Sequence, residues 1–181
     1  HVMEDLACQC SLQNVSTYIP AFADEVGPIL DQIVAEGRPT YLRLGAGPNT
    51  PEGAETYGSF KHIVRSDAPI GTVIALGPVA ANVLTALNDE LLTGQFDVFT
   101  ATNLPLDLPS DLAHRWAGKP MLVVEEHVSI GRLAQQLSVK LLTVGASPSH
   151  FLSLTAQVYA NVLYGDQKST HQLSGSDPAN D

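Results

Sequence analysis

The apolar residues of the N-terminal quarter of the chain follow a strand, helix, strand order. Residues 15–19 are β-branched or aromatic around one serine, which is typical of a short strand. From residue 23 to 36 the apolar side chains recur every three or four positions and the pattern stops at Gly37, which predicts a helix. Residues 39–44 (PTYLRL) are again typical of a strand. This order is the βαβ unit, in which we expect the two strands to be parallel.

Strands and helices continue to alternate through the rest of the chain. We expect strands 59–65 and 71–76 to pair antiparallel, with 59–65 at an edge of the sheet. The alternation predicts an α/β fold, a small and mainly parallel sheet with flanking helices, preceded by an incomplete βαβ piece of a second α/β domain. The other predicted strands are 95–100, 121–125 and 139–144, and the other predicted helices are 3–11, one opening at Pro78, 109–117, 130–137 and 151–163.

A segment rich in glycine and proline separates these two parts, and it holds few large apolar residues. Such a composition is typical of a linker. We therefore expect a truncated first domain at 1–47, a linker at 48–57, a second α/β domain at 58–165 and a disordered polar tail at 166–181. Because the chain is already in a helical pattern at its first residues, we also expect it to be the back part of a longer protein.

The charge of the chain limits its partners. Nine Lys and Arg against nineteen Asp and Glu give a net charge of −10, so nucleic acid and anionic membranes are poor partners. No apolar run reaches the ~20 residues that cross a bilayer. Its two cysteines, Cys8 and Cys10, fit neither a disulfide framework nor the usual zinc spacing. These features predict a cytoplasmic protein without a metal site of its own.

The most suggestive group of polar residues is Glu125, Glu126 and His127, at the carboxyl end of a predicted buried strand. Two carboxylates beside an imidazole can bind or orient a ligand there, and this edge is where α/β proteins usually bind ligands. The alternative is a strand end that is polar because it emerges into solvent. The chain has no nucleophile elbow, no H-E-x-x-H and no P-loop, so it holds no self-contained catalytic set.

Several segments of the chain resemble transketolases. Segments 1–7 (HVMEDLA), 12–15 (LQNV), 19–21 (IPA) and 39–45 (PTYLRLG) resemble the end of the pyrimidine-binding domain of that family. Segment 123–131 (VVEEHVSIG) resembles a strand end in its C-terminal domain. In all, the resemblance covers about residues 1 to 165, so that the expected first domain is a truncated pyrimidine-binding domain and the second a transketolase C-terminal domain.

The resemblance implies a thiamine-diphosphate enzyme that transfers a two-carbon ketol unit between sugar phosphates. In the family the cofactor and its Mg²⁺ lie between two subunits, and the parts that hold the diphosphate, as well as the first half of the pyrimidine domain, are absent from this sequence. We therefore expect this segment to serve subunit contact and the active-site rim, in a homodimer or with a complementary N-terminal subunit. By itself it should bind no cofactor and be inactive.

The same resemblance supplies two weaker site candidates. The substrate-binding histidine of the family stands four residues before a helix glutamate, whereas His1 stands three before Glu4. The family often has a phosphate-binding arginine after the strand glycine, where this chain has Ala46. Neither position is matched in this chain. His1 is the nearest candidate for the catalytic residue, and Arg43, a strand residue that does not occupy the position of that arginine, is the candidate for substrate binding.

Two other interpretations stay open. The beta subunit of a 2-oxo-acid dehydrogenase and deoxyxylulose phosphate synthase share this pair of domains. The chain is alternatively a non-catalytic assembly or regulatory module that binds a partner through its own surface, in which case Glu125, Glu126 and His127 are the residues to test.

Overall fold

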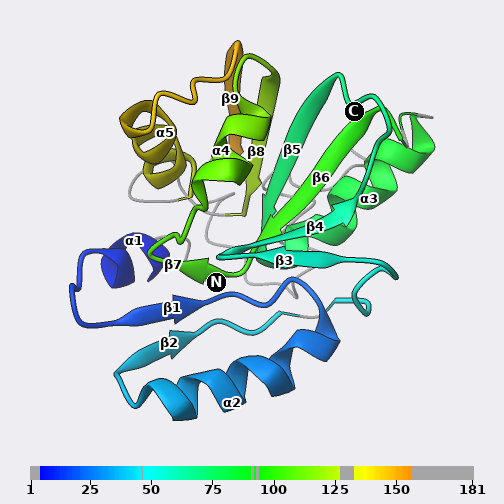
Figure 1. The fold of residues 1–181 in the computed structure, drawn as a ribbon. Coiled ribbons are helices and arrows are strands. Elements are labelled where there is room, and N and C mark those ends of the chain that lie inside the picture. Colours follow the sequence, from blue (N-terminus) through cyan, green and yellow to red (C-terminus); the bar gives the residue numbers. More distant parts are fainter. Residues whose placement is uncertain (1–4, 46, 91, 93, 127–132, 156–181) are drawn as a thin grey trace, which may run out of the picture.

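The N-terminal part of the chain forms a small sheet with one covering helix (Figure 1). The computed structural model describes residues 5–45, 47–90, 92, 94–126 and 133–155. β1 and β2 are parallel, with Ser16 opposite Thr40, so the predicted βαβ unit is confirmed. The helix ends at Gly37, which takes a left-handed conformation with φ of 61°. The elements of this part are α1 (Asp5–Cys10), β1 (Ser16–Tyr18), a 3₁₀ turn η1 (Ala23–Glu25), α2 (Val26–Glu36) and β2 (Thr40–Leu42).

The rest of the described chain builds a six-stranded sheet with the strand order β3-β4-β6-β5-β8-β9. Three of its five strand pairs are parallel and the two that involve β4 are antiparallel. The predicted α/β fold with a mainly parallel sheet is therefore confirmed. The elements are β3 (Glu55–Tyr57), β4 (Phe60–Val64), β5 (Gly71–Leu76), a 3₁₀ turn η2 (Gly77–Val79), α3 (Ala80–Asp89), β6 (Phe96–Ala101), β7 (Asn103–Leu104), α4 (Ser110–Trp116), β8 (Pro120–Glu125), α5 (Leu133–Thr143) and β9 (His150–Thr155).

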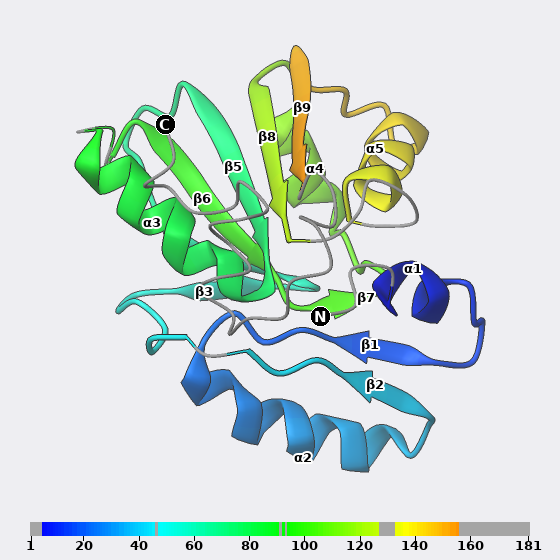
Figure 2. The same ribbon diagram turned by 180° about the vertical axis from the view of Figure 1, so that it is seen from behind.

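The large sheet is covered on both faces, with α4 and α5 on one side and α3 on the other (Figures 1 and 2). Each face has its own apolar core. Alternate residues of one strand point to opposite faces, and accordingly Ile74 of β5 belongs to the α4–α5 core and Val73 to the α3 core. The N-terminal part reaches both cores, since Ile19 joins the first and Phe22 the second.

The two parts of the chain also share backbone pairing. β7 follows β6 of the large sheet in the sequence, but it pairs antiparallel with β1 and forms the third strand of the small sheet. Close by, Gly77 has a φ of +70°, and a Cβ at this position would lie 2.4 Å from Cγ2 of Ile19. Glycine is required here both for the turn and for the close approach to the chain just after β1. The carboxyl ends of β1 and β5 therefore meet.

The predicted strand 139–144 is wrong, because these residues belong almost entirely to α5. Leu133, Leu137 and Leu141 are each fully buried and four positions apart, so a single helix places all three in the core. The β-branched residues at 139 and 144 suggested a strand, but Val139 is exposed and contributes nothing to that core.

The predicted helix 151–163 is also wrong over its described part. Residues 150–155 form β9, which extends the sheet in parallel with β8. Backbone pairing to β8 decides this conformation, since most side chains of β9 stay exposed. The remainder of that predicted helix and the predicted tail 166–181 lie outside the described residues.

The position of the segment 59–65 also differs from expectation. Its strand, β4, pairs antiparallel with β6 and not with β5. Nor is it an edge strand, because residues 55–57 of the expected linker form β3 and pair with it. A three-residue strand with exposed Glu55 and Thr56 carries no apolar pattern that the sequence could reveal.

Candidate functional site

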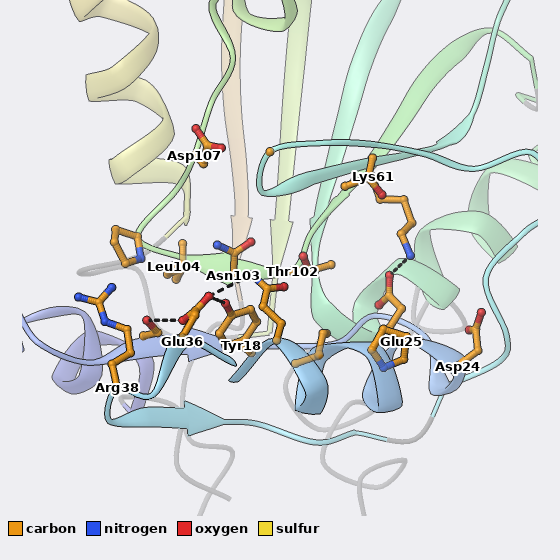
Figure 3. A pocket seen from close by; sticks show the side chains of 17 residues that line it. Tyr18, Asp24, Glu25, Glu36, Arg38, Lys61, Thr102, Asn103, Leu104 and Asp107 are labelled. Atoms are coloured by element: carbon orange, nitrogen blue, oxygen red, sulfur yellow. Dashed lines mark hydrogen bonds and ion pairs between the residues drawn. The ribbon is translucent and has the colours of Figure 1, made fainter. Parts of the chain in front are cut away.

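A cleft of about 500 Å³ lies where the small sheet meets the large one (Figure 3). On one side it is bounded by β1 and α2, and on the other by the β3–β4 turn, the start of β4 and the chain around β7. Its lining residues are Ser16, Tyr18, Asp24, Glu25, Pro28, Ile29, Gln32, Glu36, Arg38, Thr56, Gly58, Lys61, Thr102, Asn103, Leu104, Pro105 and Asp107.

One ion pair spans this cleft. The Nζ of Lys61, on β4, lies 2.5 Å from Oε1 of Glu25, which is only 5% exposed. The other oxygen of Glu25 accepts hydrogen bonds from the backbone N–H groups of Ala21 at 2.8 Å and Phe22 at 3.1 Å. Glu25 therefore fixes the turn after β1 and ties it to the large sheet.

Tyr18 and Glu36 form a second polar group on the small-sheet side of the cleft (Figure 3). The hydroxyl of Tyr18 donates to Oε1 of Glu36 at 2.5 Å, and the amide of Gln32 donates to the same oxygen at 3.0 Å. The bond from Tyr18 holds the pKa of Glu36 below its ordinary value. Burial, followed by the bond and charge of Glu36, raises the pKa of Tyr18 to about 12. At neutral pH this pair therefore presents a fixed carboxylate and a neutral phenol, not a proton-transfer group.

The pH dependence of stability tests this pair. Because folding raises the pKa of Tyr18 from 10 to about 12, its contribution to stability is complete below pH 10 and is lost as the pH rises toward 12. We expect Tyr18→Phe to flatten the decrease in the free energy of unfolding over that range, measured by urea denaturation. Glu36→Gln is the control that removes charge alone, and it should shift the late tyrosine titration to lower pH. Identical titration and stability curves for Tyr18→Phe and the wild type would contradict the assignment.

Arg43, the sequence candidate for substrate binding, contacts Asp5 of α1. Its Nη1 lies 2.5 Å from Oδ2 of Asp5, and the hydroxyl of Tyr41 donates to the same oxygen at 2.6 Å. Burial, aided by Asp5, raises the pKa of Tyr41. In this structure Arg43 therefore links the end of β2 to α1, and the substrate-binding role stays a prediction.

The structure describes only two of the three polar residues predicted at the end of a strand, Glu125 and Glu126. Glu125 is 3% exposed, and its carboxylate accepts hydrogen bonds from the backbone N–H groups of Leu133 at 3.2 Å and Ala134 at 3.0 Å. It therefore holds the N-terminal end of α5, as a capping carboxylate does. Glu126 follows it directly, and His127 lies outside the described residues, as does His1.

Sequence reasoning missed a buried pair formed by two neighbouring strands of the large sheet. Nε2 of His62, on β4, lies 3.2 Å from Oδ1 of Asp97, on β6, and its ring stacks on Phe99 at 4.1 Å between centroids. Burial lowers the pKa of His62 although Asp97 opposes this shift. The same oxygen of Asp97 accepts the backbone N–H of Ser66 at 3.0 Å, while the hydroxyl of Ser66 donates to Gly94. These contacts hold the end of β4, and they engage the hydroxyl of Ser66 with the backbone.

Within the ranges that the structure describes, no three His, Cys, Asp or Glu side chains are placed to hold a metal ion. Over the same residues, no helix has the length and apolar character that crossing a bilayer requires.

The sequence matches no protein-family model and no curated protein, but its fold matches solved transketolase structures. One is a split-gene transketolase described as an inactive beta4 tetramer, with a TM-score of 0.75 at 22% identity. The transketolase of Campylobacter jejuni gives a TM-score of 0.73 at 15% identity, and that of Leishmania mexicana 0.70 at 13%.

These matches cover nearly all of this chain but only part of each transketolase chain. Each covers 99% of this chain, but the matched region is 59% of the split-gene chain, 27% of the Campylobacter chain and 26% of the Leishmania chain. The resemblance inferred from the sequence is thus confirmed at the level of fold. The chain has the fold of one segment of a transketolase chain and spans about a quarter to three fifths of the length of these proteins.

Proposed function

We propose that this chain is the C-terminal segment or subunit of a transketolase-type enzyme, which transfers a two-carbon ketol unit between sugar phosphates with thiamine diphosphate and Mg²⁺. The observation that carries the proposal is the match of nearly the whole chain to a split-gene transketolase, a protein whose chain is itself a part of a divided enzyme. The joined small and large sheets are the region that the two folds have in common.

The residues described here do not fit the role of holding the cofactor. A diphosphate with its magnesium ion needs oxygen ligands that converge on the metal, and the described residues offer no such cluster. Three of the four carboxylates that line the cleft are engaged, by Lys61, Tyr18 and Thr50. We therefore propose that a complementary N-terminal subunit supplies the diphosphate and metal site.

In this proposal the chain provides subunit contact and part of the active-site rim. Two pairs of exposed apolar side chains, one on α2 and one on β9, support a contact role, because a partner surface would remove them from water. On α2, Leu30 is 45% and Val34 79% exposed, and on β9, Leu152 is 58% and Leu154 50% exposed.

Reconstitution tests the proposal. The purified chain is mixed with the N-terminal transketolase half encoded in the same genome, together with thiamine diphosphate and Mg²⁺. We expect ketol transfer from xylulose 5-phosphate to an aldose phosphate in the mixture, a complex in analytical ultracentrifugation, and no transfer by either part alone. A complex that instead decarboxylates a 2-oxo acid, or no complex at all, would overturn the assignment.

A further inference from the structure

A second hollow, of about 400 Å³, lies at the other end of β4 and β6 from the cleft. The cleft contains Lys61 near the start of β4 and Thr102 after β6, whereas this hollow contains Arg65 after β4 and Asp97 near the start of β6. We call it the basic hollow. Its lining residues are Tyr57, Arg65, Ser66, Pro69, Asp97, Arg115 and Lys119.

The basic hollow concentrates positive charge on an acidic protein. It holds three of the nine basic residues of a chain whose net charge is −10. Against these stand one lining carboxylate, Asp97, and the neighbouring Glu55, which accepts hydrogen bonds from Tyr57 and Arg65. Because like charges repel, three cations around one concave surface are unfavourable unless an anion accompanies them. The arrangement therefore favours a negatively charged ligand.

The three cations are little neutralised by the protein. Among the described residues, no carboxylate pairs with Arg115 or Lys119. Arg115 lies over the ring of Tyr57, 5.7 Å from its centroid. Arg65 pairs with Glu55 at 2.8 Å, but both side chains are more than half exposed, so that water and salt screen this pair.

The elements that carry these cations are held in place. Lys119 lies between α4 and β8, where its N–H donates to the carbonyl of Trp116 at 3.2 Å and its carbonyl accepts from Ser149 at 3.0 Å. Arg65 precedes Ser66, whose N–H is fixed by the buried Asp97. The donors are thus presented by ordered backbone and not by a long loop.

We propose that the basic hollow binds the phosphate group of a small phosphorylated molecule. Two guanidinium groups match the oxygens of a phosphate in bidentate fashion, and the ammonium of Lys119 adds a point charge. The volume lies within the range of small-molecule sites and exceeds what inorganic phosphate alone would fill. Asp97 lies deeper and repels the anion, so that the phosphate is held at the rim by Arg65, Arg115 and Lys119.

Calorimetric titration of the purified chain with inorganic pyrophosphate at 150 mM NaCl tests the site. We expect saturable binding to one site, weakened at least tenfold in Arg115→Gln and in Lys119→Gln. Asp97→Asn, which removes only the opposing charge and keeps an acceptor oxygen, should tighten binding. This opposite response distinguishes a charge-defined site from a general loss of structure, and circular dichroism checks that each variant is folded.

Lys140→Gln is the matched control, because it changes the net charge equally but lies on α5 outside the hollow. It should leave binding within twofold of the wild type. An equal loss in Lys140→Gln and Lys119→Gln, or no binding up to 10 mM pyrophosphate, would overturn the proposal. The titration needs no partner subunit, so its result is independent of the reconstitution test for ketol transfer.

Discussion

Replacing Trp116 with alanine is expected to lower the free energy of unfolding by about 3–5 kcal/mol, the usual cost of truncating a large buried aromatic side chain. Trp116 lies on α4 and is only 2% exposed. Its side chain packs against the neighbouring strands β4 and β6. Its ring lies edge-on to Phe60 at 5.3 Å and to Phe99 at 5.1 Å, with an angle of 81° in both pairs. Such edge-to-face pairs add to the energy of burial, so alanine loses both contributions.

Urea denaturation followed by circular dichroism measures this loss, since the variant lacks the only tryptophan of the chain. Trp116→Phe is the control. The indole Nε1 is buried without a hydrogen-bond partner in the described structure, so phenylalanine removes an unsatisfied group and keeps most of the packing. We expect a loss below about 1.5 kcal/mol for it. A loss below 1 kcal/mol for Trp116→Ala would show that α4 does not anchor this core.

Local patterns of apolar residues predicted most of the helices and strands correctly. The helix that ends at Gly37 and the strand at 71–76 have both a clear apolar pattern and a matching place in the structure. The errors at the C-terminal end have a common cause: 139–144 and 151–155 hold apolar residues that the structure leaves exposed. A pattern of apolar residues predicts an element only when the structure buries that pattern.

The cleft and the basic hollow escaped prediction for a different reason. Glu25 and Lys61 are 36 positions apart, and Arg65 and Lys119 are 54 apart, in a fold whose strand order differs from the order in the sequence. The pairing of β4 with β6 sets the positions of Lys61, on β4, and Arg65, just after it, and no local signal in the sequence specifies that pairing. The strand-end residue Glu125 was visible in the sequence, but its buried partners on α5 were not.

Glu125 shows how a polar residue at a strand end can serve the fold. Its carboxylate bonds two backbone N–H groups at the beginning of α5, and Leu133, Leu137 and Leu141 of that helix are fully buried. We expect Glu125→Leu to lower the free energy of unfolding by about 2–4 kcal/mol, because each buried N–H left unpaired costs about 1–3 kcal/mol and the helix can relax in part.

Glu125→Gln retains one carbonyl oxygen and should lose about half as much, whereas Glu52→Gln removes an exposed carboxylate and should change stability by less than about 0.5 kcal/mol. Urea denaturation at pH 7 measures all three variants. A ligand-binding role predicts the reverse order of effects, since removing an unneeded buried charge from an empty site stabilises a protein. Unchanged or increased stability in Glu125→Leu would therefore favour a ligand-binding role for Glu125 and contradict its role in holding α5.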